Sequence, residues 1–121
     1  NIGTPLFTKV SEMLPEDIVV LEMSSFQLMN MKISPSISVV TNVTPNHLDY
    51  HTDLEEYTEA KKEIFRHQDE KGILVLNYDN LVTREFAKEA NGEVIFFSDQ
   101  ERLDNGYIVD EGTIKFCENI Y

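Results

Sequence analysis

Hydrophobic and polar residues are distributed along the chain in a pattern that favours parallel strands separated by helices. Four short segments are apolar on both faces and rich in β-branched residues, as expected for buried strands: 17–23, 37–43, 72–78 and 92–98. Helical spacing or helix-starting residues occur in the segments before and between them: 5–14, 24–30, 53–67 and 80–90. Because the two kinds of segment alternate, we predict an α/β fold with a mainly parallel sheet flanked by helices.

The end of the chain has a different pattern. Residues 107–116 place an Asp-Glu-Gly turn between two short strand-like runs, which is typical of an antiparallel hairpin. We therefore expect residues 1–98 to form the parallel α/β part and residues 99–121 to form a small antiparallel addition, as a sheet of its own or the start of one. No repeat or proline-rich linker separates the two parts, so one domain is expected.

The composition excludes several classes of protein. With 121 residues, 41% of them hydrophobic, the chain has enough apolar material for one modest core. Its formal net charge of −12 argues against binding to nucleic acid or to an anionic membrane surface. No apolar stretch approaches the about 20 residues that span a bilayer. The single cysteine, Cys117, excludes an internal disulfide and fits a reducing compartment such as the cytoplasm.

Potential ligands follow two of the predicted strands. Glu22 ends the first strand, and a dense group of polar residues follows the second: Asn46, His47, Asp49 and His51. Ligands collect at the carboxyl ends of parallel strands, and about a dozen residues is close to the minimum for a crossover between parallel neighbours. We therefore expect Glu22 and His47 to face one crevice. Each also has an ordinary interpretation, as a solvated acid at a strand end and as a histidine hydrogen-bonded to a carbonyl.

Lys61 lies on the apolar side of the predicted helix 53–67, whereas Lys62 lies on its polar side. The apolar side is formed by Leu54, Tyr57, Ile64 and Phe65. A snorkelling lysine at this position would cover apolar surface with its stem and place its ammonium in water. A functional lysine would be desolvated, which lowers its pKa and makes the neutral amine a nucleophile toward carbon dioxide or an acyl group. Together with an acid and a histidine, such a lysine suits a divalent cation and a phosphate.

Three stretches of the sequence resemble a known family. They are LEMSSFQL at 21–28, TNVTPNHLDYH at 41–51 and EYTEAKKEIF at 56–65. In this order they are similar to the central domain of the Mur ligases, the ATP-dependent amino-acid-adding enzymes of peptidoglycan synthesis. The SSFQL element resembles the branch of the family that adds D-glutamate, and the opening NIGTPL resembles the end of that branch's substrate loop. The resemblance covers most of the chain and is weakest beyond about residue 98.

The resemblance implies part of a P-loop-type domain from a cytoplasmic ligase, with ATP and Mg²⁺ as cofactors. Glu22 would ligate the Mg²⁺ on the nucleotide phosphates, and His47 a second Mg²⁺. Lys61 would be carbamylated and help to hold that second ion, which makes Lys61 and His47 the candidate catalytic residues. Asn1 and Ser24 would contact the muramoyl substrate. The reaction implied is activation of UDP-N-acetylmuramoyl-L-alanine as an acyl phosphate, which the amine of D-glutamate then attacks.

The same resemblance implies that parts of the enzyme lie outside this sequence. The glycine-rich phosphate loop and the two substrate domains of the family have no counterpart here, so the isolated chain is expected to be inactive. Asp49 is expected to orient the loop or the histidine, and His51 and His67 to be loop or surface residues. In SSFQL, the serines can also cap the crossover while Phe26 and Leu28 pack it.

Two alternative functions remain open at this point. One is another Mur-type or folylpolyglutamate-type ligase with the same fold and the same modified lysine, against which the SSFQL element argues. The other is a binding module that keeps the fold without the chemistry.

Overall fold

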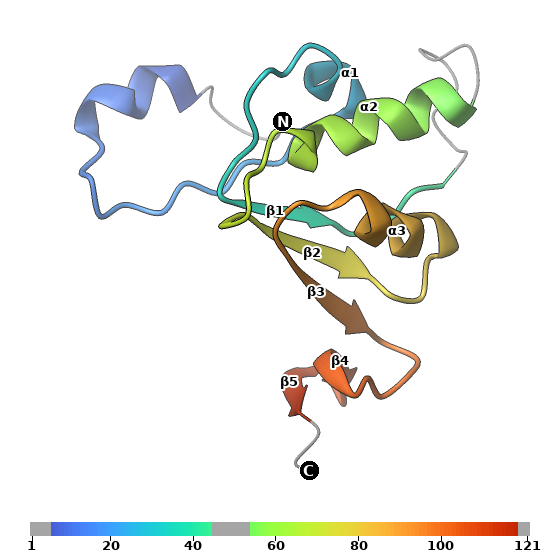
Figure 1. Cartoon of the computed structure of the whole chain (residues 1–121). Helices are drawn as coiled ribbons and strands as arrows, with labels where there is room; N and C mark the ends of the chain where they lie inside the picture. The colour runs from blue at the N-terminus through green and yellow to red at the C-terminus, as the bar shows by residue number, and fades with distance from the viewer. Residues whose placement is uncertain (1–5, 45–53, 119–121) are drawn as a thin grey trace.

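A single sheet organises the chain, whose computed structural model describes residues 6–44 and 54–118. The sheet has five strands in the order β1-β2-β3-β4-β5 (Figure 1). They are β1 (Ile37–Val40), β2 (Ile73–Asn77), β3 (Glu93–Ser98), β4 (Asn105–Asp110) and β5 (Thr113–Glu118). The first four strands pair in parallel, and β4 and β5 pair antiparallel. The predicted α/β fold, with its mainly parallel sheet and C-terminal hairpin, is confirmed.

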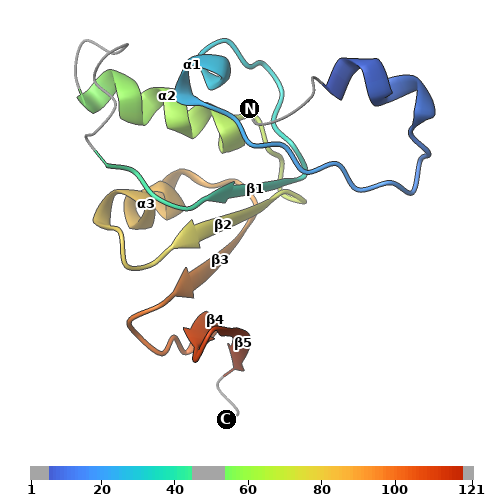
Figure 2. The same cartoon turned by 180° about the vertical axis from the view of Figure 1, so that it is seen from behind.

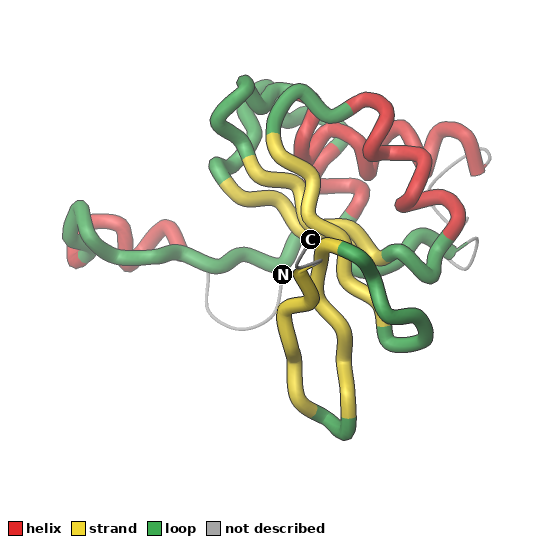
Figure 3. Tube along the Cα trace, turned by 60° about the horizontal axis from the view of Figure 1, so that its bottom comes forward, coloured by secondary structure: helices red, strands yellow, loops and turns green. Residues whose placement is uncertain are grey.

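The helices gather on one side of this sheet, as Figures 2 and 3 show, apart from one short helix near the amino end. The α-helices are α1 (Ser25–Leu28), α2 (Leu54–Arg66) and α3 (Leu81–Phe86), and the 3₁₀ helices are η1 (Leu6–Glu12) and η3 (Ala87–Glu89). No helix in the described ranges is long and apolar enough to cross a membrane.

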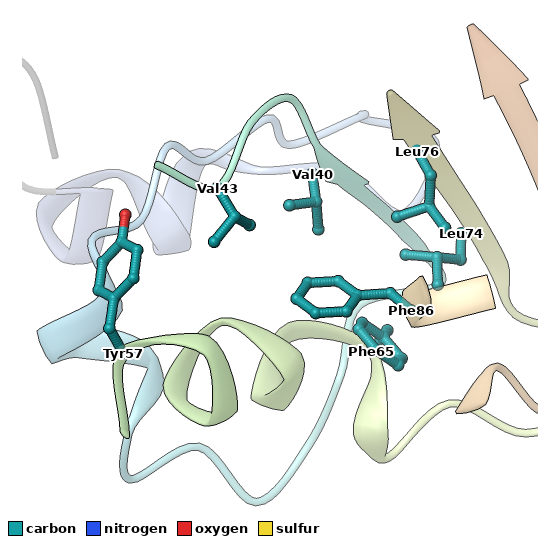
Figure 4. Close-up of a cluster of buried hydrophobic side chains, with 7 residues drawn as sticks. All are labelled: Val40, Val43, Tyr57, Phe65, Leu74, Leu76 and Phe86. Carbon is teal, nitrogen blue, oxygen red and sulfur yellow. The ribbon is translucent and has the colours of Figure 1, made fainter. Parts of the chain in front are cut away.

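The hydrophobic core lies between the sheet and the helices α2 and α3 (Figure 4). Its buried members are Val40, Val43, Tyr57, Phe65, Leu74, Leu76 and Phe86. The ring centroids of Phe65, from α2, and Phe86, from α3, lie 5.5 Å apart. This core fixes α2, and with it the lysine predicted to be functional, over the end of the sheet that carries β1.

The opposite face of the sheet is apolar as well, and no described helix covers it. Strand pairing places on this face Ile37, Val39, Ile73, Val75, Ile95, Phe97, Tyr107, Val109, Ile114 and Phe116. Ile37 and Ile114 are 59% and 70% exposed. Parallel sheets are usually covered on both faces. Here only one face is covered by described helices, so the hydrophobic core of the described residues lies on that face.

The predicted strand at 17–23 is wrong. These residues form no strand, and Ile18 and Val20 are 90% and 89% exposed. A strand needs a neighbour to bond its backbone amides and carbonyls, and β1 pairs with β2 alone among the strands described. Residues 17–23 are therefore not paired with β1, although its other edge is open in the described part of the chain, and Glu22 does not end a strand.

The helix predicted at 5–14 is present only as the 3₁₀ helix η1, which buries none of its residues. Val10, which helical spacing would place on one face with Leu6 and Met13, is 55% exposed. Short helices depend on tertiary packing for their stability, and η1 projects away from the sheet (Figure 1). The apolar residues of this segment have helical spacing, but none of those in η1 is buried.

The C-terminal hairpin extends the main sheet and does not form one of its own. β4 pairs in parallel with β3 through Phe97 with Tyr107 and Ser98 with Ile108. The turn between β4 and β5 has Glu111 at a φ of 48° and Gly112 at 76°. Gly112 adopts its left-handed value without steric cost, whereas Glu111 is a non-glycine residue in a region that side chains disfavour. The predicted turn is confirmed.

Candidate functional site

A cleft of about 300 Å³ lies between residues 20–23, the carboxyl end of β1 and helix α2. Glu22 lines it from the first segment and Lys61 from α2. Apolar side chains, among them Leu28 and Ile64, line it as well, together with Thr41 and Asn42. Glu22 and Lys61 thus line one cleft, which residues 20–23 reach without forming a strand, and their roles in a site stay a prediction.

The surroundings of Lys61 lower the pKa of its ammonium group. Burial in the cleft is the main cause, and the negative charge of Glu22 opposes it. The Nζ atom lies 5.5 Å from the centre of the Tyr57 ring, one turn earlier on α2. That ring is 3% exposed, and burial raises the pKa of its hydroxyl. A larger neutral fraction of the Lys61 amine follows, as nucleophilic chemistry requires.

Lys62 lies beside Lys61 in the sequence but in a different environment. Its Nζ is 2.7 Å from a carboxylate oxygen of Glu59 and 2.7 Å from one of Glu89. Burial alone would lower the pKa of Lys62, but these two hydrogen-bonded carboxylates outweigh it and raise that pKa. The Lys62 side chain is only 14% exposed, so it is not the freely solvated residue that its helical position predicted. Lys62 is thus paired with two carboxylates, whereas Lys61 is desolvated in the cleft beside the Tyr57 ring.

Ser24 begins α1 with a capping box. Its Oγ accepts a hydrogen bond from the Gln27 amide at 3.3 Å, and Gln27 Oε1 accepts one from the Ser24 amide at 2.9 Å. Leu28 is 1% exposed, whereas Phe26 is 65% exposed. The predicted capping by Ser24 and the predicted packing of Leu28 are confirmed. The predicted packing of Phe26 is wrong, because α1 is a single turn that buries Leu28 and leaves the Phe26 side chain outside. A contact of Ser24 with substrate stays a prediction.

Several predicted site residues lie outside the described residues. These are Asn1, Asn46, His47, Asp49 and His51. The meeting of Glu22 with His47 therefore stays a prediction, although Thr41 and Asn42, which follow β1, do line the cleft. His67 is far from it, beside Glu63 at 3.1 Å with its side chain 32% exposed, which confirms it as a surface residue.

The donor set of the cleft is compatible with Mg²⁺. No three acidic, histidine or cysteine side chains within 6–44 and 54–118 gather closely enough to hold a metal ion. Mg²⁺ in nucleotide sites is bound through one or two carboxylates, with phosphates and waters as its other ligands. Glu22 offers such a carboxylate at the cleft.

Two asparagines that the sequence did not single out contact the end of β1. Asn77 donates a hydrogen bond to the Thr41 carbonyl at 3.0 Å, and Asn80 donates one to the Val43 carbonyl at 3.1 Å. Asn80 precedes a helical run, so the sequence could reveal it as a helix cap. Its bond to the Val43 carbonyl joins residues that are distant in the sequence, so no local sequence pattern predicts it.

Comparison with known proteins agrees with this geometry. Residues 1–116 match the family described as the Mur ligase middle domain. The chain is 50% identical over 121 residues to a UDP-N-acetylmuramoylalanine–D-glutamate ligase of Clostridium acetobutylicum, a match that covers 98% of the chain and 26% of that protein. Ligases of the same name from Acetivibrio thermocellus and Clostridium tetani are 53% and 48% identical, over 96% and 100% of the chain and 25% of each protein. The chain thus spans about a quarter of the length of these relatives, and it belongs to the Mur ligase family.

Proposed function

We propose that the protein containing this chain is a cytoplasmic ligase that joins D-glutamate to UDP-N-acetylmuramoyl-L-alanine with the hydrolysis of ATP. The observation that carries the proposal is the 48–53% identity to ligases of that name over nearly the whole chain. The cleft supports it, because Glu22 and Lys61, which the family resemblance singles out, line one cavity.

In this proposal the substrate carboxylate attacks the γ-phosphate of ATP, so that ADP leaves and an acyl phosphate forms. The amine of D-glutamate then attacks the acyl carbon, and phosphate leaves. Glu22 would hold the Mg²⁺ that, when bound, offsets the negative charge of the phosphates. His47 would ligate a second ion, and Asn1 and Ser24 would contact the muramoyl substrate.

Lys61 has a separate task in the proposal. Its neutral amine attacks carbon dioxide, the new N–C bond opens one C=O bond, and the nitrogen loses a proton to water. The product is a carbamate anion in place of a cation. A desolvated amine favours the first step, which agrees with the lowered pKa of Lys61 in the cleft. Lys62, whose charge is held by two carboxylates, is a poor candidate for the same reaction.

The test uses the complete reading frame that contains this sequence. The purified protein is mixed with ATP, Mg²⁺ and UDP-N-acetylmuramoyl-L-alanine, and phosphate release and product mass are measured with D-glutamate, L-alanine or L-lysine. We expect phosphate release and a new product with D-glutamate only. Turnover with a different amino acid would assign the protein to another branch, and no turnover with any would favour a binding module.

A further inference from the structure

Asn80 joins the start of α3 to the end of β1. Its Oδ1 accepts hydrogen bonds from the amides of Val82 at 3.1 Å and Thr83 at 3.0 Å, which caps α3. Its Nδ2 donates to the Val43 carbonyl at 3.1 Å and to the side-chain oxygen of Asn42. A side-chain amide has two hydrogens and two acceptor sites on its oxygen. All four are used here, so the orientation of the amide is fixed.

One of the two residues that accept hydrogen bonds from Asn80 lines the candidate cleft, and the other follows it in the sequence. Asn42 lines the cleft together with Thr41, Glu22 and Lys61. Val43 is 3% exposed and belongs to the hydrophobic core. These residues follow the last residue of β1, where ladder bonds no longer fix the backbone. The two donated bonds of Asn80, called the tie from here on, therefore connect Asn42 on the cleft wall, and the adjacent Val43, to the start of α3.

The chemistry of the residue separates its two tasks. Aspartate and serine cap helices as well as asparagine does, so capping α3 does not require an amide. A carboxylate has no hydrogen to donate and a hydroxyl has one, so neither reproduces both donated bonds. We propose that Asn80 is a positioning residue of the cleft, which holds Asn42 in place on the cleft wall through its bonds to the Asn42 side chain and the Val43 carbonyl.

Two variants separate the tie from the cap. Asn80→Asp keeps the acceptor oxygen for α3 and removes both donated bonds. Asn91→Asp is the matched control, because Asn91 Nδ2 donates to the main-chain carbonyl of Gln68 at 3.1 Å, at the amino-terminal edge of the sheet. Both variants add one negative charge and remove an amide-to-carbonyl bond. If Asn80→Asp fails to fold, Asn80→Ser, which also keeps a capping oxygen, replaces it.

The first measurement is carbon-detected NMR of this chain. In Asn80→Asp we expect the carbonyl ¹³C resonance of Val43 to move upfield, because it loses its donor, while the amides of Val82 and Thr83 keep their protection from hydrogen exchange. Asn91→Asp should leave the Val43 resonance in place. An unchanged Val43 resonance in Asn80→Asp would overturn the tie itself.

The second measurement is steady-state kinetics in the complete ligase, and this part rests on the proposed function. A displacement of about 1 Å in a site can lower the rate on the order of 10²-fold. Because Asn80→Asp releases Asn42 on the cleft wall, we expect this variant to lower kcat about tenfold or more, with KM within about threefold. Asn91→Asp should change neither. A moved Val43 resonance with unaltered kcat would refute the positioning role. A wild-type protein that does not ligate D-glutamate would refute the proposed function instead, while the Val43 resonance still decides the tie.

Discussion

Lys61 and Lys62 are neighbours on α2, and replacing each of them with methionine should affect the stability of the chain differently: Lys62→Met should lower it, and Lys61→Met should not. Methionine keeps the apolar stem and removes the charge. At position 61 the lost charge is one that burial in the cleft disfavours. At position 62 it is a charge held by the carboxylates of Glu59 and Glu89. A lysine kept for chemistry costs stability, whereas a lysine kept for structure adds to it.

The size of the difference follows from the geometry. Each ion pair of Lys62 is about 2.7 Å long, and its partner carboxylates are 46% and 49% exposed. Pairs of this exposure contribute about 0.2–1 kcal/mol each, so Lys62→Met should lower the free energy of unfolding by about 1 kcal/mol. Lys61→Met should leave it unchanged or raise it by about 0.5 kcal/mol, the scale of substitutions that relieve a functional strain.

Thermal unfolding of this chain, followed by circular dichroism at pH 7 and low salt, measures both variants. A difference of about 1–1.5 kcal/mol corresponds to a separation of about 5 °C between their Tm values, with Lys61→Met the higher. The separation should shrink in about 1 M salt, because the ion pairs of Lys62 are screened. Equal losses of Tm for the two variants, or a larger loss for Lys61→Met, would show that Lys61 is an ordinary structural lysine.

Three further predictions test the core, the acid response and the isolated chain. Phe86→Ala, at a side chain 1% exposed, should lower the free energy of unfolding by about 3–5 kcal/mol, whereas Phe7→Ala, at 88% exposure, should change it by less than about 0.5 kcal/mol in the same urea titration. Burial raises the pKa of Asp79, but hydrogen bonds from the Ser98 hydroxyl and the Asp99 amide outweigh burial and lower it below the ordinary 3.8. The stability from this carboxylate is present above its unfolded pKa and is lost as the pH falls through the lowered pKa. The gap in Tm between wild type and Asp79→Asn should therefore narrow as the solution is acidified, and a constant gap would contradict the assignment. The chain alone should not hydrolyse ATP with Mg²⁺, and metal-dependent turnover of about 1 per second or faster would contradict that expectation.

The sequence predicted the three parallel strands β1, β2 and β3 well. Segments 37–43, 72–78 and 92–98 became β1, β2 and β3, shortened by one to three residues. Segment 17–23 has the same apolar pattern and forms no strand. The pattern reports that a segment can be buried, and it contains no information about which neighbour will supply the hydrogen bonds. Tertiary pairing decides that question.

Around the candidate site as well, positions set by the local sequence were predicted, and contacts set by the tertiary fold were missed. Helical spacing placed Lys61 on the inner side of α2, because position on a helix is a local property. The same spacing placed Lys62 in solvent, and this was wrong because Glu89, one of its two partners, is 27 residues away in the sequence. The bonds of Asn80 to the end of β1 span 37 and 38 residues and were missed for the same reason.

We propose that the cleft of Glu22 and Lys61 is part of the reaction centre of a D-glutamate-adding ligase. The most direct measurement is the kcat of Lys61→Ala and Lys62→Ala in the complete protein, with and without a short-chain carboxylic acid that can stand in for the lost carbamate. We expect Lys61→Ala to lose at least about 10²-fold in kcat and to recover part of it with the added acid, while Lys62→Ala stays within about threefold of wild type. Equal kcat values for the two variants would contradict the account.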